Sequence, residues 1–272
     1  MLQLFKTEWL KVKSYRTFWI LFGSFFIFLP ATLLMTADRF MHQINQMEGK
    51  NMETAIMKSL LSAPFIFPNV WRGAAWFGGL FFIIIGMLFI LLVTNEVQYK
   101  THRQNIIDGW SRTDFITAKL SMLLFFVVST TVMVFLCGLV CGLLFTPDLS
   151  SVSIFENIRY VGYYALMATL YLVVAFLVAI LIKRTGLAIV VYFGYVFVID
   201  NLLWLVLTFR KSQLGYFLPL ESSDSLIPNP FKPSNIELRT VPDLNLLITA
   251  VIYGTLMLYG IFRYYRNADL KT

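Results

Sequence analysis

The chain has few side chains that could take part in catalysis or ion binding, and one of them lies inside a long apolar run. Asp200, followed by Asn201, lies in the stretch 187–208, whose other residues are mostly aliphatic or aromatic. A charge in hydrocarbon costs at least about 2.5 kcal/mol, so this carboxylate must face protein or water. It predicts either a substrate-contact or gating group, or a structural role in a helix-to-helix hydrogen bond or a helix break. We favour the structural role.

The remaining reactive residues do not form a pattern typical of an enzyme. The two histidines, His42 and His102, are far apart, and no His, Cys, Asp or Glu residues have the spacing of a metal site. No serine has a His and acid partner pattern, and no G-x-x-x-x-G-K-[ST] loop is present to cradle ATP phosphates. Cys137 and Cys141 are four apart in one apolar run, where helical geometry does not favour a disulfide. We therefore expect no catalytic, cofactor or metal site on this chain.

The polar segment 95–119 is the longest soluble stretch between apolar runs on the basic side of the chain. It predicts two short helical pieces separated at Gly109-Trp110-Ser111. Thr101–Asp108 is compatible with a helix, and Gly109 follows where a left-handed cap would fall. Ser111-Arg112-Thr113-Asp114 resembles a capping box that starts a second helix. Such a stiff, folded segment suits contact with another protein, and an ordinary hydrophilic connection is the alternative.

In this segment the chain resembles the permease subunits of bacterial ATP-binding cassette (ABC) transporters, in the type-2 exporter class. That family tends to show a Glu leaving the second span, a Thr and a basic residue, a Ser-Arg turn, and a Lys before the third span. The matching residues here are Glu96, Thr101, Arg103, Ser111, Arg112 and Lys119. The chain departs from the family at Gly109-Trp110, where many relatives carry a proline, and in its long first outer connection.

The resemblance implies a coupling helix that contacts a separate ATPase. Ile106, Ile107 and Trp110 supply an apolar surface for a partner or for the bilayer. The expected ATPase-coupling residues are Glu96, Thr101, Arg103, Ile106, Ile107, Trp110, Ser111, Arg112 and Lys119. The resemblance also implies that ATP and magnesium bind to the partner ATPase rather than to this chain. The other expected partners are a second permease copy, in a homodimer or a heterodimer, and the lipid bilayer.

The elements that position these residues are predicted to be membrane-spanning helices. The chain has 272 residues, 58% of them hydrophobic and only 14% charged, whereas soluble domains carry about 25% charged residues. The apolar residues fall into runs of about 20, the length needed to cross a hydrocarbon core. We expect one all-α integral membrane domain over 1–272, with six spans at about 17–36, 74–94, 120–145, 160–182, 187–208 and 244–262. Pro30 is expected to kink the first span or end it early.

Most of the 22 lysines and arginines flank these spans on one side, which the positive-inside rule makes cytoplasmic. Both termini are therefore predicted to be cytoplasmic, and the resemblance implies a bacterial inner membrane. The net charge of +7 is then an orientation signal, so nucleic acid is not an expected partner. Residues 1–16 mix Leu, Phe and Trp with basic residues and predict an amphipathic helix in the headgroup region. The alternative is that the first span extends straight into the cytoplasm.

The two long outer connections carry different signals. In 37–73, residues 51–61 are amphipathic, and Pro64 and Pro68 break the chain before Trp71, which is predicted to anchor at the membrane interface. The connection 209–243 is rich in proline but also apolar, which predicts a segment packed on the bundle, either a lid or a static cap. Gly138 and Gly142 offer a small surface for close helix approach.

Together with the layout of the spans, the resemblance implies the permease subunit of an ATP-driven ABC exporter, which forms the substrate path as a dimer and couples to ATPase subunits through 95–119. Two other functions are compatible with the sequence. One is a membrane scaffold or assembly module that recruits a soluble partner through the same segment. The other is a secondary transporter that uses Asp200 as a proton or ion site.

Overall fold

The computed structural model describes residues 2–46, 63–98, 111–150, 152–210, 212–231 and 241–267. Within these ranges all regular structure is helical and no strand is present, so the prediction of an all-α protein is confirmed. The elements are α1 (Leu2–Lys13), α2 (Arg16–Gln46), η1 (Ala63–Phe65), α4 (Val70–Gln98), α6 (Arg112–Phe145), α7 (Arg159–Leu181), α8 (Thr185–Phe193), η2 (Gly194–Ile199), α9 (Asp200–Phe209), η3 (Gln213–Phe217), α10 (Glu221–Asp224) and α11 (Asp243–Asn267).

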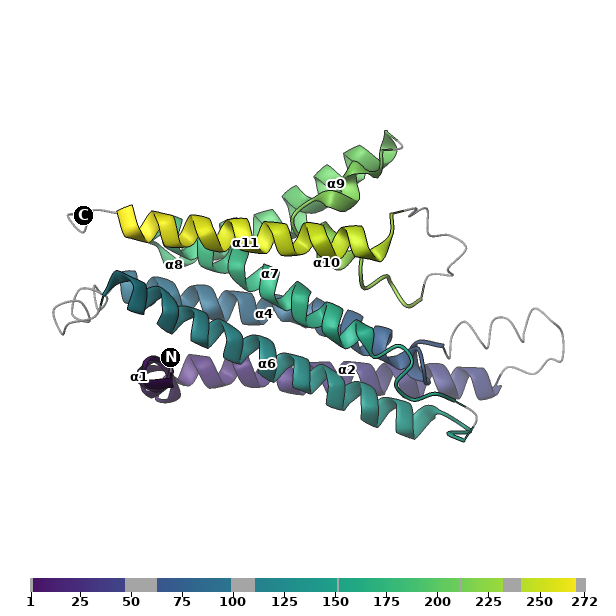
Figure 1. The fold of residues 1–272 in the computed structure, drawn as a ribbon. Coiled ribbons are helices and arrows are strands. Elements are labelled where there is room, and N and C mark those ends of the chain that lie inside the picture. The colour runs from purple at the N-terminus through teal and green to yellow at the C-terminus, as the bar shows by residue number, and fades with distance from the viewer. Residues whose placement is uncertain are drawn as a thin grey trace.

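Six helical segments of the described chain are long and apolar enough to cross a membrane. They are α2, α4, α6, α7, the continuous run α8–η2–α9, and α11. Both termini lie at the same end of the bundle, as an even number of crossings requires (Figure 1). We call this the terminal end, and the opposite end, which carries η1 and the residues between α6 and α7, the loop end. Which end faces the cytoplasm stays a prediction.

The observed helices are longer than the apolar runs from which they were predicted. Five of the six expected ranges lie inside an observed helix, and the fourth runs one residue past the end of α7. α2 continues through Pro30 to Gln46, so an early end at Pro30 is wrong. Neighbouring groups in a membrane bundle can compensate for the hydrogen bond that proline removes.

Helix α1 is separate from α2. The chain turns at Ser14-Tyr15, and α1 is seen nearly end-on in Figure 1, so it lies across the bundle axis at the terminal end. Its Trp9 ring packs edge-on against Phe18 of α2 and Phe125 of α6, with centroids 6.1 and 5.3 Å away. The alternative of one straight helix from the N-terminus is therefore wrong, and α1 is fixed to the bundle by its aromatic side.

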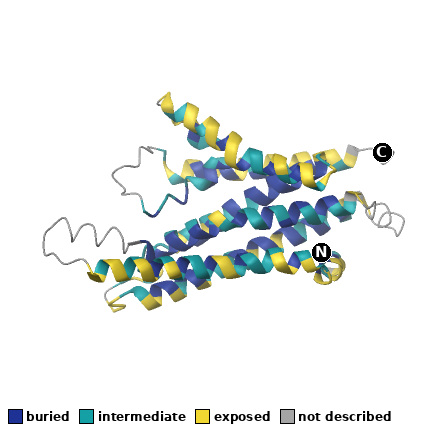
Figure 2. Cartoon of the chain, turned by 180° about the vertical axis from the view of Figure 1, so that it is seen from behind, coloured by how far each residue is buried: buried dark blue, intermediate teal, exposed yellow. Residues whose placement is uncertain are grey.

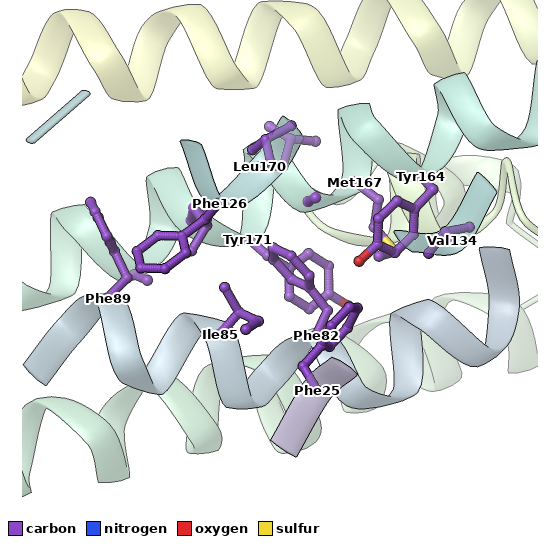
Figure 3. Packing of buried hydrophobic residues seen from close by; sticks show 14 of the residues in the cluster. Phe25, Phe82, Ile85, Phe89, Phe126, Val134, Tyr164, Met167, Leu170 and Tyr171 are labelled. Carbon is purple, nitrogen blue, oxygen red and sulfur yellow. The ribbon is translucent and has the colours of Figure 1, made fainter. Parts of the chain in front are cut away.

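The core lies around α4 and α7, which have the most extensive contact of any two helices in the described chain. Figure 3 shows Phe82, Ile85 and Phe89 of α4 facing side chains of α6 and α7, among them Phe126 and Tyr171. Burial is concentrated in these middle helices, while α9 projects from the bundle with most of its residues exposed (Figure 2). Lipid or protein must cover such apolar outer faces.

The loop end contains a tryptophan, two glycines and two cysteines that the sequence had singled out. Trp71 is fully buried, and its indole N–H donates to the Ile154 carbonyl at 2.7 Å, so its prediction as an interface anchor is wrong. Gly138 and Gly142 do provide a close approach, but to Trp71 and Phe67 of the same chain. Cys137 and Cys141 are buried free thiols, as expected. The amphipathic stretch 51–61 lies outside the described residues.

The fifth span is not a uniform α-helix. Residues Gly194–Ile199 form the π-helical turn η2, and Asn201 Nδ2 donates to the Val196 carbonyl at 2.9 Å. After α9 the chain turns back, and η3 and α10 pack against α7, α9 and α11. Leu220 and Ile227 of this returning segment are buried. The prediction that the last outer connection packs on the bundle is confirmed for residues 212–231.

Candidate functional site

Two residues that the sequence singled out in 95–119 meet in space at the terminal end. Lys119 Nζ, two turns into α6, lies 2.7 Å from Glu96 Oε1, near the end of α4. The same ammonium group pairs with Glu8 of α1. Lys11 of α1 completes the group, with its Nζ 2.9 Å from Glu8 Oε1 and 3.3 Å from Glu96 Oε1. We call Glu8, Lys11, Glu96 and Lys119 the ion cluster.

The ion cluster is largely withdrawn from solvent. Only 1% of the Glu8 side chain and 2% of the Lys119 side chain are exposed, against 37% for Lys11. Burial alone would raise the pKa of Glu8, but the attraction of Lys119 and Lys11 outweighs it and holds that pKa below the usual value. Burial alone would likewise lower the pKa of Lys11, but Glu96 and Glu8 outweigh it and raise that pKa. Glu8 and Lys11 are therefore charged at neutral pH.

Aromatic contacts extend the ion cluster to the last span. The Lys119 ammonium lies 5.4 Å from the centroid of the Phe115 ring on its own helix. Phe115 in turn packs on Tyr265 of α11, with ring centroids 5.3 Å apart. Three helices, α1, α4 and α6, thus meet at one buried ammonium group, and α11 is joined to them through Phe115.

The start of α6 is fixed by the predicted capping box. Ser111 Oγ accepts from the Asp114 amide at 3.1 Å, and Asp114 Oδ2 accepts from the Ser111 amide at 2.8 Å. The two bonds satisfy donors that a helix N-terminus leaves open. This prediction is confirmed, and α6 therefore begins rigidly at the exit of 95–119.

The end of α4 is also tied to the fifth span. The hydroxyls of Thr94 and Thr185 are 2.9 Å apart, and Thr185 also donates to Asn95 Oδ1 at 3.5 Å. Thr185 is the first residue of α8, directly after the short connection from α7. The entrance to 95–119 is thereby fixed on one side by the ion cluster and on the other by α8.

The structure describes only part of the expected coupling set. Glu96, Ser111 and Lys119 are described, whereas Thr101, Arg103, Ile106, Ile107 and Trp110 lie outside the described residues. Arg112 is the first residue of α6, but its side chain is not described.

Glu8 and Lys11 belong to the site, although neither was predicted from the sequence as a member of it. The available signal was weak: Glu8 is the sole acidic residue in 1–16, and it stands three positions before Lys11. Residues three apart on a helix are neighbours, so this spacing predicted a local pair. It did not predict the pairing of α1 with α4 and α6.

Asp200 and Asn201 lie apart from the ion cluster and do not share one environment. The Asp200 side chain is only 3% exposed, and its Oδ2 accepts from the Glu221 amide of α10 at 3.1 Å. Asn201 is exposed and bonds within its own helix. This hydrogen bond is consistent with the structural role favoured for Asp200. It joins Asp200 to α10, not to another membrane-spanning helix.

A model of the family described as "ABC-2 family transporter protein" matches residues 4–199, more than two thirds of the chain. The chain therefore belongs to the ABC-2 family of transporter proteins. No curated protein gives a match to it. Family membership and the six apolar helices together define a multi-pass membrane permease of the ABC transporter class. The matched range contains all of the ion cluster and ends one residue before Asp200.

Proposed function

We propose that this chain is the permease subunit of an ATP-driven exporter in a bacterial cytoplasmic membrane. It would form the substrate path together with a second permease copy. ATP and magnesium would bind to separate ABC ATPase chains, and the segment 95–119 would contact them. Family membership supports the transporter class, and the ion cluster supports the coupling role.

The observation that carries the coupling role is the fixation of 95–119 at both ends. At its entrance Glu96 is paired with Lys119 and Lys11, and at its exit the capping box and Lys119 hold α6. Separating such buried partners leaves an uncompensated charge, at a cost of about 3–5 kcal/mol. A force that reaches the two described ends of 95–119 would therefore move α4, α6 and α1 together.

Uneven burial supports the second copy. Within the most apolar stretch of each helix, 67% of α7 is buried but only 17% of the fifth span and 17% of α11. Large apolar faces of membrane helices are covered by lipid or by other helices. We propose that the second permease copy covers the face of α8–η2–α9, because this span has little of its surface inside the subunit.

The proposed function is tested by purifying the tagged chain from its native membrane in a mild detergent. We expect an ABC ATPase to co-purify and to hydrolyse ATP in the complex. Arg103→Glu and Arg112→Glu should each weaken this association or uncouple hydrolysis from transport. Arg184→Glu is the matched control, because Arg184 is exposed at the same end of the bundle but lies outside 95–119.

Three results would count against the proposal. The absence of any ATPase from the complex would favour a scaffold role instead. Unchanged association and coupling in both segment variants would remove 95–119 from the contact. Gradient-driven uptake by the purified chain alone, abolished by Asp200→Asn, would favour a secondary transporter.

A further inference from the structure

A cavity of about 820 Å³ lies beside the returning segment, between α4, α7, the fifth span and α10. Its aromatic wall comes from Trp76, Tyr171, Phe197, Trp204 and Tyr216. Protein sites for small ligands have about this volume, with mostly apolar walls and a few polar groups. The volume is therefore sufficient for one drug-sized molecule.

The polar part of the cavity contains two acidic side chains, beside the neutral polar residues Asn201, Thr208, Ser225 and Asn229. Glu221 and Asp224 line it, and Asp200 lies against Glu221 through the bond from the Glu221 amide. Asp224 Oδ2 accepts from the Tyr171 hydroxyl at 2.7 Å, and Glu221 Oε1 accepts from the Ser225 hydroxyl at 2.6 Å. The second oxygens of Asp224 and Asp200 are buried and have no hydrogen-bond partner among the described residues.

None of these three carboxylates forms an ion pair with a basic side chain in the described part of the chain. All four ion pairs found there belong to the ion cluster at the terminal end. Burial raises the pKa of Glu221, which lies outside the six spans, to about 7. Burial, and then the nearby Glu221, also raise the pKa of Asp224 well above its ordinary value. Grouping like charges away from water is unfavourable, so a bound cation would stabilise the site.

The lining distinguishes between kinds of cation. Among the described residues, no group of His, Cys, Asp and Glu could hold a metal ion. Aromatic faces beside carboxylates instead suit an organic cation, because the ring quadrupole and the carboxylate both attract the positive centre. The apolar remainder of the wall, which includes Met167 and Val196, suits an apolar body.

We propose that this cavity binds an amphipathic organic cation, with its charged centre against Glu221 and Asp224 and its apolar body against the aromatic wall. The three carboxylates lie beyond the residues that match the family model. The identification of this cation as the exported substrate rests on the proposed function, whereas its binding needs neither ATP nor the ATPase.

The binding test uses the full chain in phosphatidylcholine nanodiscs, without any ATPase. Tetraphenylphosphonium is the probe, and tetraphenylborate is its counterpart of nearly the same shape and opposite charge. Equilibrium dialysis, corrected with empty nanodiscs, should show saturable binding of the cation and none of the anion. Equal binding of both ions would overturn the proposal, because the cavity would then be selecting apolar surface alone, and so would the absence of saturable cation binding.

Variants locate the site. Glu221→Gln combined with Asp224→Asn should weaken cation binding at least about tenfold, since a buried charge partner is lost from each contact. Glu156→Gln removes an exposed acid at the same end of the bundle and should leave the affinity unchanged. Unchanged affinity in the double variant would overturn the proposal.

A thermal unfolding measurement separates loss of binding from loss of fold. Without ligand, the double variant should unfold at the wild-type temperature or above it, because it removes two uncompensated carboxylates. Tetraphenylphosphonium should raise the midpoint of the wild type only. If the double variant unfolds earlier, the carboxylates are structural and the proposal fails. A chain that binds the cation but recruits no ATPase would overturn the proposed function and leave this site intact.

Discussion

Lys119 and Glu8, 111 positions apart in the sequence, form an ion pair in which both side chains are almost completely buried. The pair joins the transverse helix α1 to the helix that leaves the segment 95–119. Since Lys119 also pairs with Glu96 at the other end of this segment, one ammonium group connects three helices.

The first prediction concerns that ammonium group. Lys119→Met should lower the free energy of unfolding by about 3–5 kcal/mol, because Glu8 and Glu96 lose a buried partner. Lys183→Met, which alters an exposed lysine at the same end, should change it by less than about 0.5 kcal/mol. Denaturant titration of the purified protein measures both values. Equal effects of the two substitutions would show that the ion cluster does not stabilise the fold.

The second prediction concerns how the stabilisation by Glu8 in the ion cluster depends on pH. The pKa of Glu8 is lower in the folded protein than in the unfolded chain, so its stabilising effect is complete above the unfolded value of about 4.3 and is lost as pH falls through the folded value. The difference in unfolding midpoint between the wild type and Glu8→Gln should thus be constant from pH 8 to about pH 5 and shrink at lower pH. A difference that grows on acidification would contradict this assignment.

The third prediction addresses the start of α6. Ser111→Ala removes the hydroxyl that accepts from the Asp114 amide and should cost about 1 kcal/mol locally. Hydrogen exchange at the first-turn amides should rise about fivefold as a result. Ser121→Ala, in the same helix but away from its cap, should leave these rates unchanged.

The fourth prediction concerns close packing at the loop end. A Cβ at Gly73 would overlap the Pro64 carbonyl oxygen, whereas a Cβ at Gly162 would meet nothing within 4 Å. Gly73→Ala should therefore destabilise the protein by about 1–3 kcal/mol. Gly162→Ala should be neutral or stabilising, since alanine favours a helix. The order of the two thermal midpoints checks both expectations.

The fifth prediction tests orientation. Ser111 and Glu156 are exposed at opposite ends of the bundle, and both natural cysteines are buried. In intact cells a membrane-impermeant maleimide should label Glu156→Cys but not Ser111→Cys, and disruption of the membrane should expose both. Labelling of Ser111→Cys in intact cells would place 95–119 outside and remove it from any contact with a cytoplasmic ATPase.

Local signals in the sequence predicted local structure well. Apolar runs predicted the six long helices. The spacing of Ser111 and Asp114 predicted a helix cap that involves only residues 111–114. Both signals depend on neighbours in the chain. The ends of helices were predicted less well, because helices such as α2 extend into polar sequence beyond the apolar run.

Contacts between distant residues could not be predicted in this way. Spacing along the chain does not reveal that Glu8 meets Lys119, or that Asp224 of the returning segment meets Tyr171 in the middle of α7. Trp71 was misplaced for a related reason: a tryptophan near the end of a span suits an interface as well as a packed core. The fold buries it and gives its N–H a carbonyl partner.

The π-helical turn Gly194–Ile199 determines which way the second half of the fifth span faces. Such a turn accommodates one residue more than an α-helical turn, and each residue of an α-helix advances the direction of its side chains by about 100°. If the same residues wound as a regular α-helix, the extra residue would rotate the side chains of α9 by about that angle about the helix axis. Trp204 would then turn away from the cavity and Asp200 away from Glu221, so the acidic cavity depends on a one-residue irregularity in the fifth span.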